Sequence, residues 1–233
     1  MRLAISHPWN LTVDQAKALQ AQLAQQVLPE TTFDASAVQT VAGVDVGFRG
    51  DVARAAVVVL SFPRLELIDT ALAEVQVTFP YVPGLLAFRE GPAVLSALER
   101  LGTWPDLFLF DAHGLAHPRR LGLAAHMGVI LDWPSIGCAK SRLTGHHEDP
   151  AEAAGEWVPL LDAGQTIGAV VRSRRAVQPL YVSIGHRLDL PTAIDFVLRC
   201  TRSYRLPETT RYAHQVAGGK TVRVDRGPFQ SPP

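Results

Sequence analysis

Three acidic residues close to apolar segments are the side chains of this sequence with the clearest capacity for chemistry. Asp45 lies in VAGVDVGF, Glu90 in PYVPGLLAFRE and Asp111 in DLFLFDAHG. Asp45 and Asp111 close runs of strand composition, so each carboxylate should leave the core at the rim of a sheet. Carboxylates brought together there repel one another unless a cation lies between them. The pattern predicts a divalent-metal site suited to phosphodiester chemistry.

Each acid also has an ordinary structural interpretation. Asp45 could simply cap a turn, and Glu90, in a helical segment that follows Gly84, is unremarkable by itself. Asp111 is harder to explain in that way, because it follows the bulky apolar run 107–110. A half-buried carboxylate costs several kcal/mol unless it is paired or bound to a metal. The metal interpretation therefore depends on the acids acting together.

The segment 79–84, FPYVPG, predicts a rigid loop just before Glu90. Pro80 and Pro83 restrict the backbone, and Gly84 permits a close approach of another group. Tyr81 is held between the prolines. It is either a buried tyrosine in a proline-braced turn or a wedge that stacks into a base step of a nucleic acid.

Lys140 and His117 are the further candidates for work on a phosphate. Lys140, followed by Ser141 in GCAKSRL, could stabilise charge that develops in a transition state. His117 in GLAHPRR could shuttle a proton or contact a phosphate, since an unperturbed imidazole titrates near ~6.5. A zinc site at His146 and His147 is an alternative, although adjacent histidines lack the i,i+4 spacing of a zinc-binding helix.

Composition limits the class of protein. The chain has 233 residues, of which 47% are hydrophobic, enough for one core and one domain over residues 1–233. Its 22 basic and 22 acidic residues cancel, so any nucleic-acid surface must be local, for example at 117–120 or 172–175. Two cysteines argue against a disulfide scaffold. With no signal peptide and no apolar run of ~18 residues, we expect a cytoplasmic protein with no membrane partner. We also expect a monomer, with a flexible tail over the last ~15 residues.

The periodicity of apolar residues predicts a mixed α/β chain. Short spacers between the first strands favour antiparallel pairing, and the later strand–helix–strand order favours a sheet covered on both faces. We therefore expect a central mixed sheet with three antiparallel strands first and helices on both faces. The predicted helices are 12–28, 84–101, 121–131, 191–206 and 207–217, and the predicted strands are 38–48, 53–63, 65–79, 106–111 and 135–143, with a hairpin over 167–184 that turns at 173–176.

These motifs together resemble endonuclease V, the deoxyinosine 3′ endonuclease family. VAGVDVGF, PYVPGLLAFREGP, FDAHGLAHPRRLGLAAHMGV and GCAKSRL match in order between residues 41 and 143, and RSYRLPETTRYAH is similar to the C-terminal segment of the family. The combination of PYVPG and RE with DxHGxxHPRRxG is specific. The resemblance implies a ribonuclease H-like fold. It also implies cleavage of DNA at the second phosphodiester bond 3′ of a deaminated base, leaving 3′-hydroxyl and 5′-phosphate ends.

The resemblance also implies roles for individual residues. Asp45, Glu90 and Asp111 would hold Mg²⁺, with Mn²⁺ as a substitute. Tyr81 would fill the space left by a flipped base. The other expected participants are His117 and Lys140 near the scissile phosphate, His214 near the metal, Pro80, Pro83, Gly84, Leu86, Ala112 and Ser141 around the substrate, and Arg89, Arg119 and Arg120 on flanking phosphates.

Two residues depart from the family pattern, Ala112 and Cys138, the latter standing where an aliphatic residue is more usual. Three other functions also remain as alternatives. Ala112 stands where the family usually has glycine after the third acid, so its methyl group could tighten the base pocket. The alternatives are an endonuclease for inosine-containing RNA, a non-catalytic binder of inosine-containing nucleic acid, and an actin-like ATPase, because GVDVG also resembles a phosphate-binding loop. ATP turnover, or binding without metal-dependent nicking, would separate these from a DNA nuclease.

Overall fold

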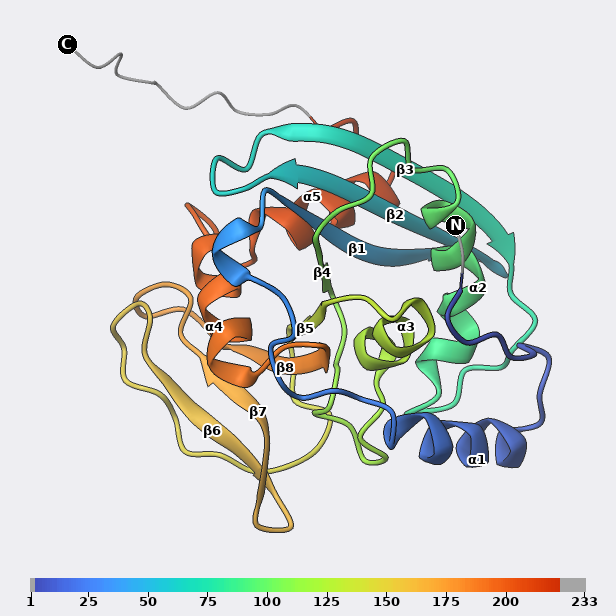
Figure 1. Ribbon diagram of the computed structural model, residues 1–233, viewed down its shortest axis with the longest axis horizontal. Coiled ribbons are helices and arrows are strands. Elements are labelled where there is room, and N and C mark those ends of the chain that lie inside the picture. The colour runs from blue at the N-terminus through green and yellow to red at the C-terminus, as the bar shows by residue number, and fades with distance from the viewer. Residues whose placement is uncertain (1–2, 223–233) are drawn as a thin grey trace.

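A computed structural model describes residues 3–222 of the chain (Figure 1). One mixed sheet holds all eight strands that the described residues form, in the order β3-β2-β1-β4-β5-β8-β7-β6. The helices are α1 (Val13–Ala24), α2 (Leu86–Leu98), α3 (Leu123–Leu131), α4 (Leu190–Arg199) and α5 (Glu208–Ala217), with a short 3₁₀ helix at Ala35–Ala37; the strands are β1 (Thr40–Arg49), β2 (Val52–Ser61), β3 (Leu67–Gln76), β4 (Leu107–Phe110), β5 (Ser135–Ala139), β6 (Trp157–Asp162), β7 (Gln165–Val171) and β8 (Leu180–His186).

The first half of the sheet confirms the predicted architecture. β1 pairs antiparallel with β2, and β2 with β3, over long ladders. β4 then pairs in parallel with β1 on one side and with β5 on the other. All four β4 residues are buried, as expected for a central strand without a polar face.

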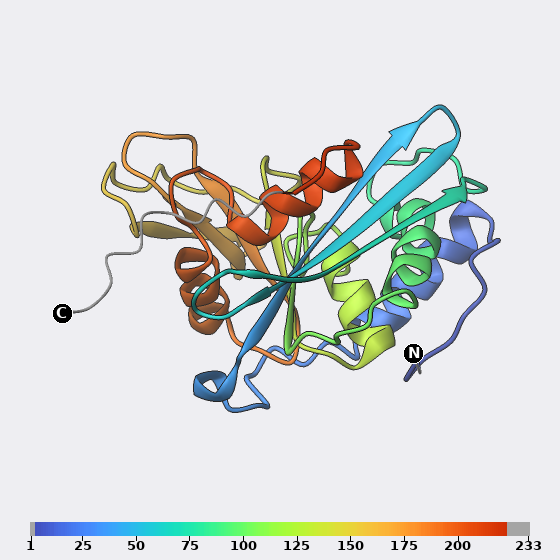
Figure 2. The same cartoon turned by 90° about the horizontal axis from the view of Figure 1, so that it is seen from above.

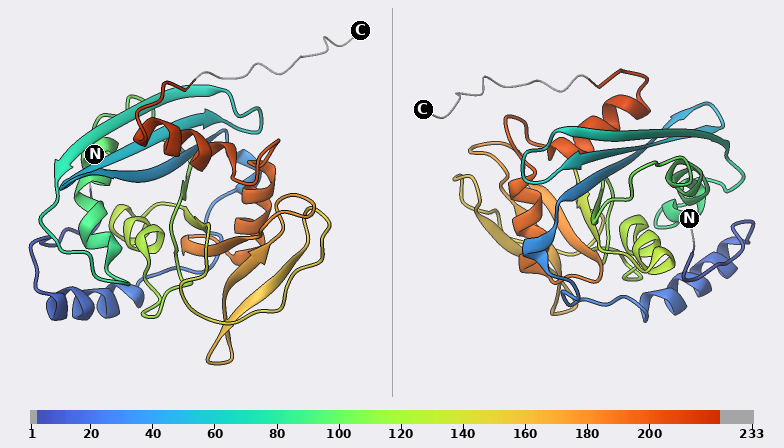
Figure 3. Two further views of the ribbon diagram at one scale, coloured as in Figure 1. Left: turned by 180° about the vertical axis from the view of Figure 1, so that it is seen from behind. Right: turned by 45° about the horizontal axis from the view of Figure 1, so that its top comes forward.

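Helices cover both faces of the sheet, which is also as predicted. Side chains alternate across β1, so Val41 packs into the core under α4 and α5, while Ala42 and Val44 pack into the core under α2 and α3. Seen from above, α4 and α5 lie on one side of the strands, and α1, α2 and α3 lie on the other (Figure 2). From behind, α5 lies across β1 and β2 (Figure 3).

The ends of several elements differ from the sequence-based predictions. The first helix begins as predicted, because Thr12 and Gln15 form a reciprocal capping box, but it ends at Ala24 rather than at residue 28. The helix predicted over 191–206 stops at Arg199, and residues 200–206 form a connection that packs against the ends of β5 and β8. The strand predicted over 135–143 ends at Ala139, so Lys140 lies just beyond its end.

β6 was not predicted at all. It is an edge strand with a partly exposed pattern and contains Pro159, which cannot donate a ladder hydrogen bond. The predicted hairpin is confirmed as β7 and β8, with a longer loop at 172–179. Most of the predicted flexible tail falls on residues 223–233, which lie outside the described residues. None of the helices within residues 3–222 has both the length and the apolarity needed to cross a bilayer.

Candidate active site

Asp45 and Asp111 lie side by side where the parallel pairing of β1 and β4 ends. The last paired residues are Val44 and Phe110, and the amide of Asp111 donates to the carbonyl of Val44 over 2.9 Å. Both acids directly follow these paired residues, so their side chains project toward the face that α5 covers. The sequence placed both acids correctly at the rim of the sheet.

Gly43 allows α5 to approach this rim closely. A Cβ atom at residue 43 would lie 2.7 Å from the amide nitrogen of Thr210 and closer still to the carbonyl of Thr209, so only glycine fits under the start of the helix. The close approach brings His214, further along α5, to Asp45. Its Nδ1 lies 2.9 Å from Asp45 Oδ2. The helix therefore completes a cluster that the strands begin.

Asp45, Asp111 and His214 form a group that fits a metal ion. One ligand atom from each residue lies within 4.8 Å of the others. Two carboxylates and an imidazole suit Mg²⁺ or Mn²⁺ through the oxygens, and Mn²⁺ through the nitrogen as well. Within residues 3–222 this is the one such group found, and His146 and His147 belong to none. His147 instead lies 3.3 Å from the hydroxyl of Tyr181.

Glu90 reaches the same region from the opposite face of the sheet. It lies on α2 and is buried, with an exposed fraction of 7%. Burial, together with the negative charges of Asp45 and Asp111, raises the pKa of Glu90 to about 8. A cation bound among the three acids would relieve this repulsion.

Lys140 supplies the positive charge at this site. Its ammonium group forms an ion pair with Asp111 Oδ2. Burial and the charge of Asp45 raise the pKa of Asp111, while Lys140 lowers it. The backbone carbonyl of Lys140 accepts a hydrogen bond of 2.7 Å from Arg205 Nη2, which also donates to Pro179 over 2.8 Å. Arg205 therefore holds the end of β5 in place beside the cluster.

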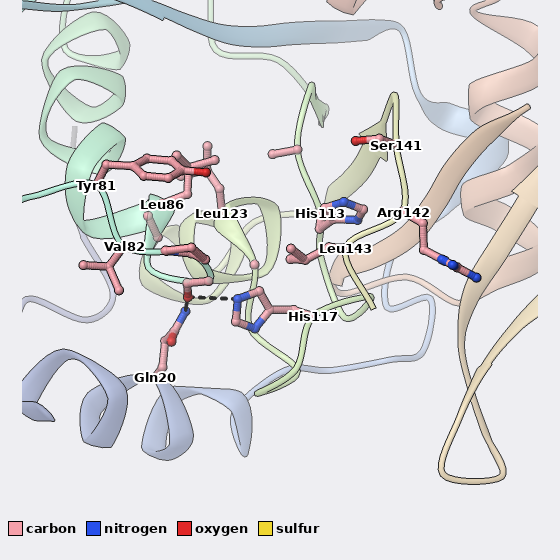
Figure 4. Close-up of a pocket in the computed structure, with 15 residues that line it drawn as sticks. Gln20, Tyr81, Val82, Leu86, His113, His117, Leu123, Ser141, Arg142 and Leu143 are labelled. Atoms are coloured by element: carbon pink, nitrogen blue, oxygen red, sulfur yellow. Dashed lines mark hydrogen bonds between the residues drawn. The ribbon is translucent and has the colours of Figure 1, made fainter. Parts of the chain in front are cut away.

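A cavity of about 220 Å³ adjoins the acid cluster, because its lining includes Ala112 and Ser141, which directly follow Asp111 and Lys140. Figure 4 shows side chains that line this cavity. Its wall includes the predicted loop residues Tyr81, Pro83 and Gly84, and Tyr81 stands at the rim with 70% of its surface exposed. The remaining lining residues are Gln20, Val82, Leu86, Ala87, Ala112, His113, His117, Gly122, Leu123, Ser141, Arg142 and Leu143. The structure thus brings together most of the residues predicted to surround a base.

His117 and Arg119 hold the loop rather than facing the acids. His117 Nε2 and Arg119 Nη2 both donate to the carbonyl of Gly84, over 2.9 and 2.7 Å, and His117 Nδ1 accepts from the amide of Arg119. Burial, together with the charge of Arg119, lowers the pKa of His117 to about 4, so the imidazole is neutral. Gly84 has a φ of 77°, a conformation that favours glycine.

Two other arginines predicted to contact phosphates also have partners within the protein. Arg89 donates to the carbonyl of Phe79 over 2.9 Å and lies over the ring of Phe48. Arg120 pairs with Asp162 on β6. Their roles on flanking phosphates, like those of the other predicted site residues, stay predictions. Pro80 braces the loop beside Tyr81 but does not line the cavity.

Sequence reasoning missed Gln20 and His113. Gln20, buried in the middle of α1, donates to the carbonyls of Gly84 and Leu121 and so fixes the loop to α3. His113 lines the cavity, and burial lowers its pKa to about 4. The proximity of His113 to Asp111 in the motif could have singled it out. Nothing in the sequence of α1 distinguishes Gln20 from its neighbouring glutamines.

Comparisons with known proteins agree with this geometry. The family model described as Endonuclease V matches residues 21–215. The curated endonuclease V of Trichormus variabilis is 54% identical over 222 residues, 94% of this chain and 100% of that protein. That of Roseiflexus sp. is 54% identical over 218 residues, 93% of this chain and 97% of that protein.

Solved structures give the same result. The crystal structure of endonuclease V from Streptomyces avermitilis has a TM-score of 0.87 at 42% identity, covering 92% of this chain and 95% of that one. Endonuclease V from Ciona intestinalis, solved in complex with a 23mer DNA containing an inosine followed by a ribo-adenosine, has a TM-score of 0.78 at 27% identity, covering 89% of this chain and 97% of that one. The expected ribonuclease H-like fold is confirmed.

Proposed function

This chain belongs to the endonuclease V family, and from that premise we propose that it is a Mg²⁺-dependent DNA repair endonuclease for deoxyinosine. It hydrolyses the second phosphodiester bond on the 3′ side of the lesion and leaves 3′-hydroxyl and 5′-phosphate ends. Mn²⁺ substitutes for Mg²⁺. The actin-like ATPase alternative has no support from the family assignment.

The observation that carries the proposal is the junction between the acid cluster and the cavity. Asp111 belongs to the cluster, and the next residue, Ala112, lines the cavity. Lys140 pairs with Asp111, and the next residue, Ser141, lines the cavity as well. A base held in the cavity would therefore have its own backbone next to the acids. This arrangement suits an enzyme that recognises one base and cuts the chain beside it.

The acids and His214 provide the place for the metal ion. Asp45 and Asp111 would bind the ion directly, and Glu90 would approach it from α2. His214 would either bind the ion or orient Asp45. When bound, the ion would lower the pKa of a coordinated water and offset negative charge on the phosphate.

The side chains around the ion position the substrate. Lys140 directs its ammonium group toward the same space as Asp111 and can stabilise charge that develops on a phosphate oxygen. His214 holds Asp45 in one orientation through its Nδ1. Both effects depend on rigid supports, which Arg205 and α5 provide.

The cavity and Tyr81 account for selection of the damaged base. Flipping a base out of a duplex costs a few kcal/mol, and less when the pair is already weak, as it is for a deaminated base. The exposed ring of Tyr81 stands at the cavity rim, where it can replace the extruded base in the stack. The methyl group of Ala112 narrows the cavity wall and favours a base without bulky substituents at that edge.

A gel assay with a duplex that contains one deoxyinosine tests the proposal. With Mg²⁺ we expect a single nick one nucleotide beyond the lesion, none with chelator, and none on the same duplex with adenine. Asp45→Ala should abolish nicking, whereas Asp14→Ala, which removes an exposed acid on α1 paired only with Lys17, should not. Binding without nicking would favour the non-catalytic alternative, and preferential cleavage of inosine RNA would favour the RNA alternative.

A further inference from the structure

A second exposed tyrosine lies close to the acid cluster, on the other side from Tyr81. Tyr204 is 52% exposed and belongs to the connection between α4 and α5. The guanidinium of Arg211 lies 4.4 Å from the centroid of its ring and equally close to the ring of Tyr212. Arg211 is itself fixed by an ion pair with Glu208. Arg211 therefore holds one face of the Tyr204 ring, while about half of the residue's surface stays exposed.

The connection that carries Tyr204 is tied down on both sides. The carbonyl of Ser203 accepts a hydrogen bond from Arg174, and Arg202 donates to the carbonyl of Arg64. Ser173 Oγ donates to the carbonyl of Arg205 over 2.7 Å. A ring on such a support loses little freedom when a ligand stacks on it, which favours binding.

Two contacts place Tyr204 beside the acid cluster. Arg211, which stacks on Tyr204, precedes His214 by one turn of α5, so both lie on the same side of the helix. Arg205, the next residue after Tyr204, donates to the carbonyl of Lys140. The base cavity lies on the other side, where α1, α2 and α3 supply its wall.

The surroundings of Tyr204 are strongly basic, although the whole chain has a net charge of zero. The segments 172–175 and 199–211 are close together through the hydrogen bonds of Arg174 and Ser173. Their only acid is Glu208. Their basic residues are Arg172, Arg174, Arg175, Arg199, Arg202, Arg205 and Arg211. An exposed aromatic ring among cations is the arrangement that binds a nucleic-acid strand through base stacking and phosphate contacts.

We propose that Tyr204 stacks on a nucleotide on the 3′ side of the cleaved bond, with Arg174 and Arg202 near the phosphates of that segment. The inference rests on the proposed function, because the lesion base in the cavity then lies 5′ of the cleaved bond. A strand that runs from the cavity through the acid cluster continues in the 3′ direction toward Tyr204. The two exposed tyrosines thus hold the strand on either side of the reacting phosphate.

Kinetics with shortened substrates test this surface. Three versions of the cleaved strand are prepared, each with one deoxyinosine. The first has long flanks on both sides, and the second has its 3′ flank cut back to the nucleotide that the cleaved bond requires. The third keeps the long 3′ flank and has an equally shortened 5′ flank. The unmodified protein should show a higher kcat/KM on the long 3′ flank than on the short one. The ratio of kcat/KM on the long 3′ flank to kcat/KM on the short 3′ flank should fall roughly tenfold in Tyr204→Ala, since stacking on one aromatic side chain has about that effect. Tyr204→Phe should keep the ratio.

The controls separate the possible failures. Asp14→Ala changes an exposed side chain on α1, which lies on the other side of the strands from α4 and α5, and should not change the ratio. Shortening the 5′ flank should affect the unmodified protein and Tyr204→Ala equally. An unchanged ratio in a Tyr204→Ala protein with normal thermal unfolding would overturn the inference. Absence of any nicking by the unmodified protein would instead overturn the proposed function, and this inference with it.

Discussion

Gly43→Ala should disable the site without changing any residue that contacts substrate. The added Cβ would lie 2.7 Å from the nitrogen of Thr210 and closer to the carbonyl of Thr209, whereas ordinary contacts begin at 3.4 Å. The start of α5 must therefore move away by at least about 1 Å. Overpacking of this kind typically costs 1–3 kcal/mol. If the free energy of unfolding decreases by about 2–3 kcal/mol, the Tm of a chain of this length should decrease by roughly 4–12 °C.

The displacement should also reach His214, because the same helix carries it to Asp45. A misplacement of about 1 Å in a catalytic arrangement can cost about 100-fold in rate. We expect kcat on deoxyinosine DNA to fall by roughly that factor and the affinity for Mn²⁺, measured by isothermal titration calorimetry, to decrease. Both should occur at temperatures where circular dichroism shows the variant to be folded.

Gly47→Ala is the matched control, since it adds the same methyl group to the same strand under the same helix. There the Cβ would meet the carbonyl oxygen of Ala217 at 3.6 Å, which is an ordinary contact. Gly47→Ala should therefore keep Tm, Mn²⁺ affinity and kcat close to those of the unmodified protein. If Gly43→Ala were indistinguishable from Gly47→Ala, the close approach of α5 would not be what assembles the site.

Three further outcomes are expected. Tyr81→Ala should reduce the preference for deoxyinosine over normal duplex, measured as a ratio of nicking rates, because the rim of the cavity loses its exposed ring; an unchanged ratio would remove the wedge role. Arg205→Ala should lower kcat roughly tenfold with little change in KM, because the backbone of Lys140 loses a charge-assisted hydrogen bond; a change confined to KM would contradict this. His126 is fully buried, and burial lowers its pKa to about 3, below the unfolded value of 6.5. The unfolded chain therefore binds the extra proton as pH falls through 6.5, and the His126 contribution to the free energy of unfolding should decrease by about 2 kcal/mol between pH 7 and pH 5. Urea unfolding of His126→Phe should show a correspondingly flatter pH dependence, and an equal slope in both proteins would refute the buried neutral state.

Much of the fold and part of the site follow from local patterns in the sequence. Strand-like apolar runs separated by Gly, Asp, Arg and Pro predicted β1, β2 and β3, and the acids that follow the paired parts of β1 and β4 were placed at the rim of the sheet, where they are found. A capping residue such as Thr12 also acts within its own helix. These predictions succeeded because each depends on residues within a few positions of one another, whose periodicity and capping chemistry are visible along the chain.

Only the tertiary structure decided which distant side chains meet. The space at Gly43 lets α5 bring His214 to Asp45, and the burial of Glu90 depends on how α2 packs beneath the sheet. Gln20 reaches the carbonyl of Gly84 across 64 positions in the sequence. His117 and Arg119 turned out to hold that same carbonyl. Such contacts are set by the separation between packed elements, and a shift of about 1 Å, which no local pattern records, makes or breaks them.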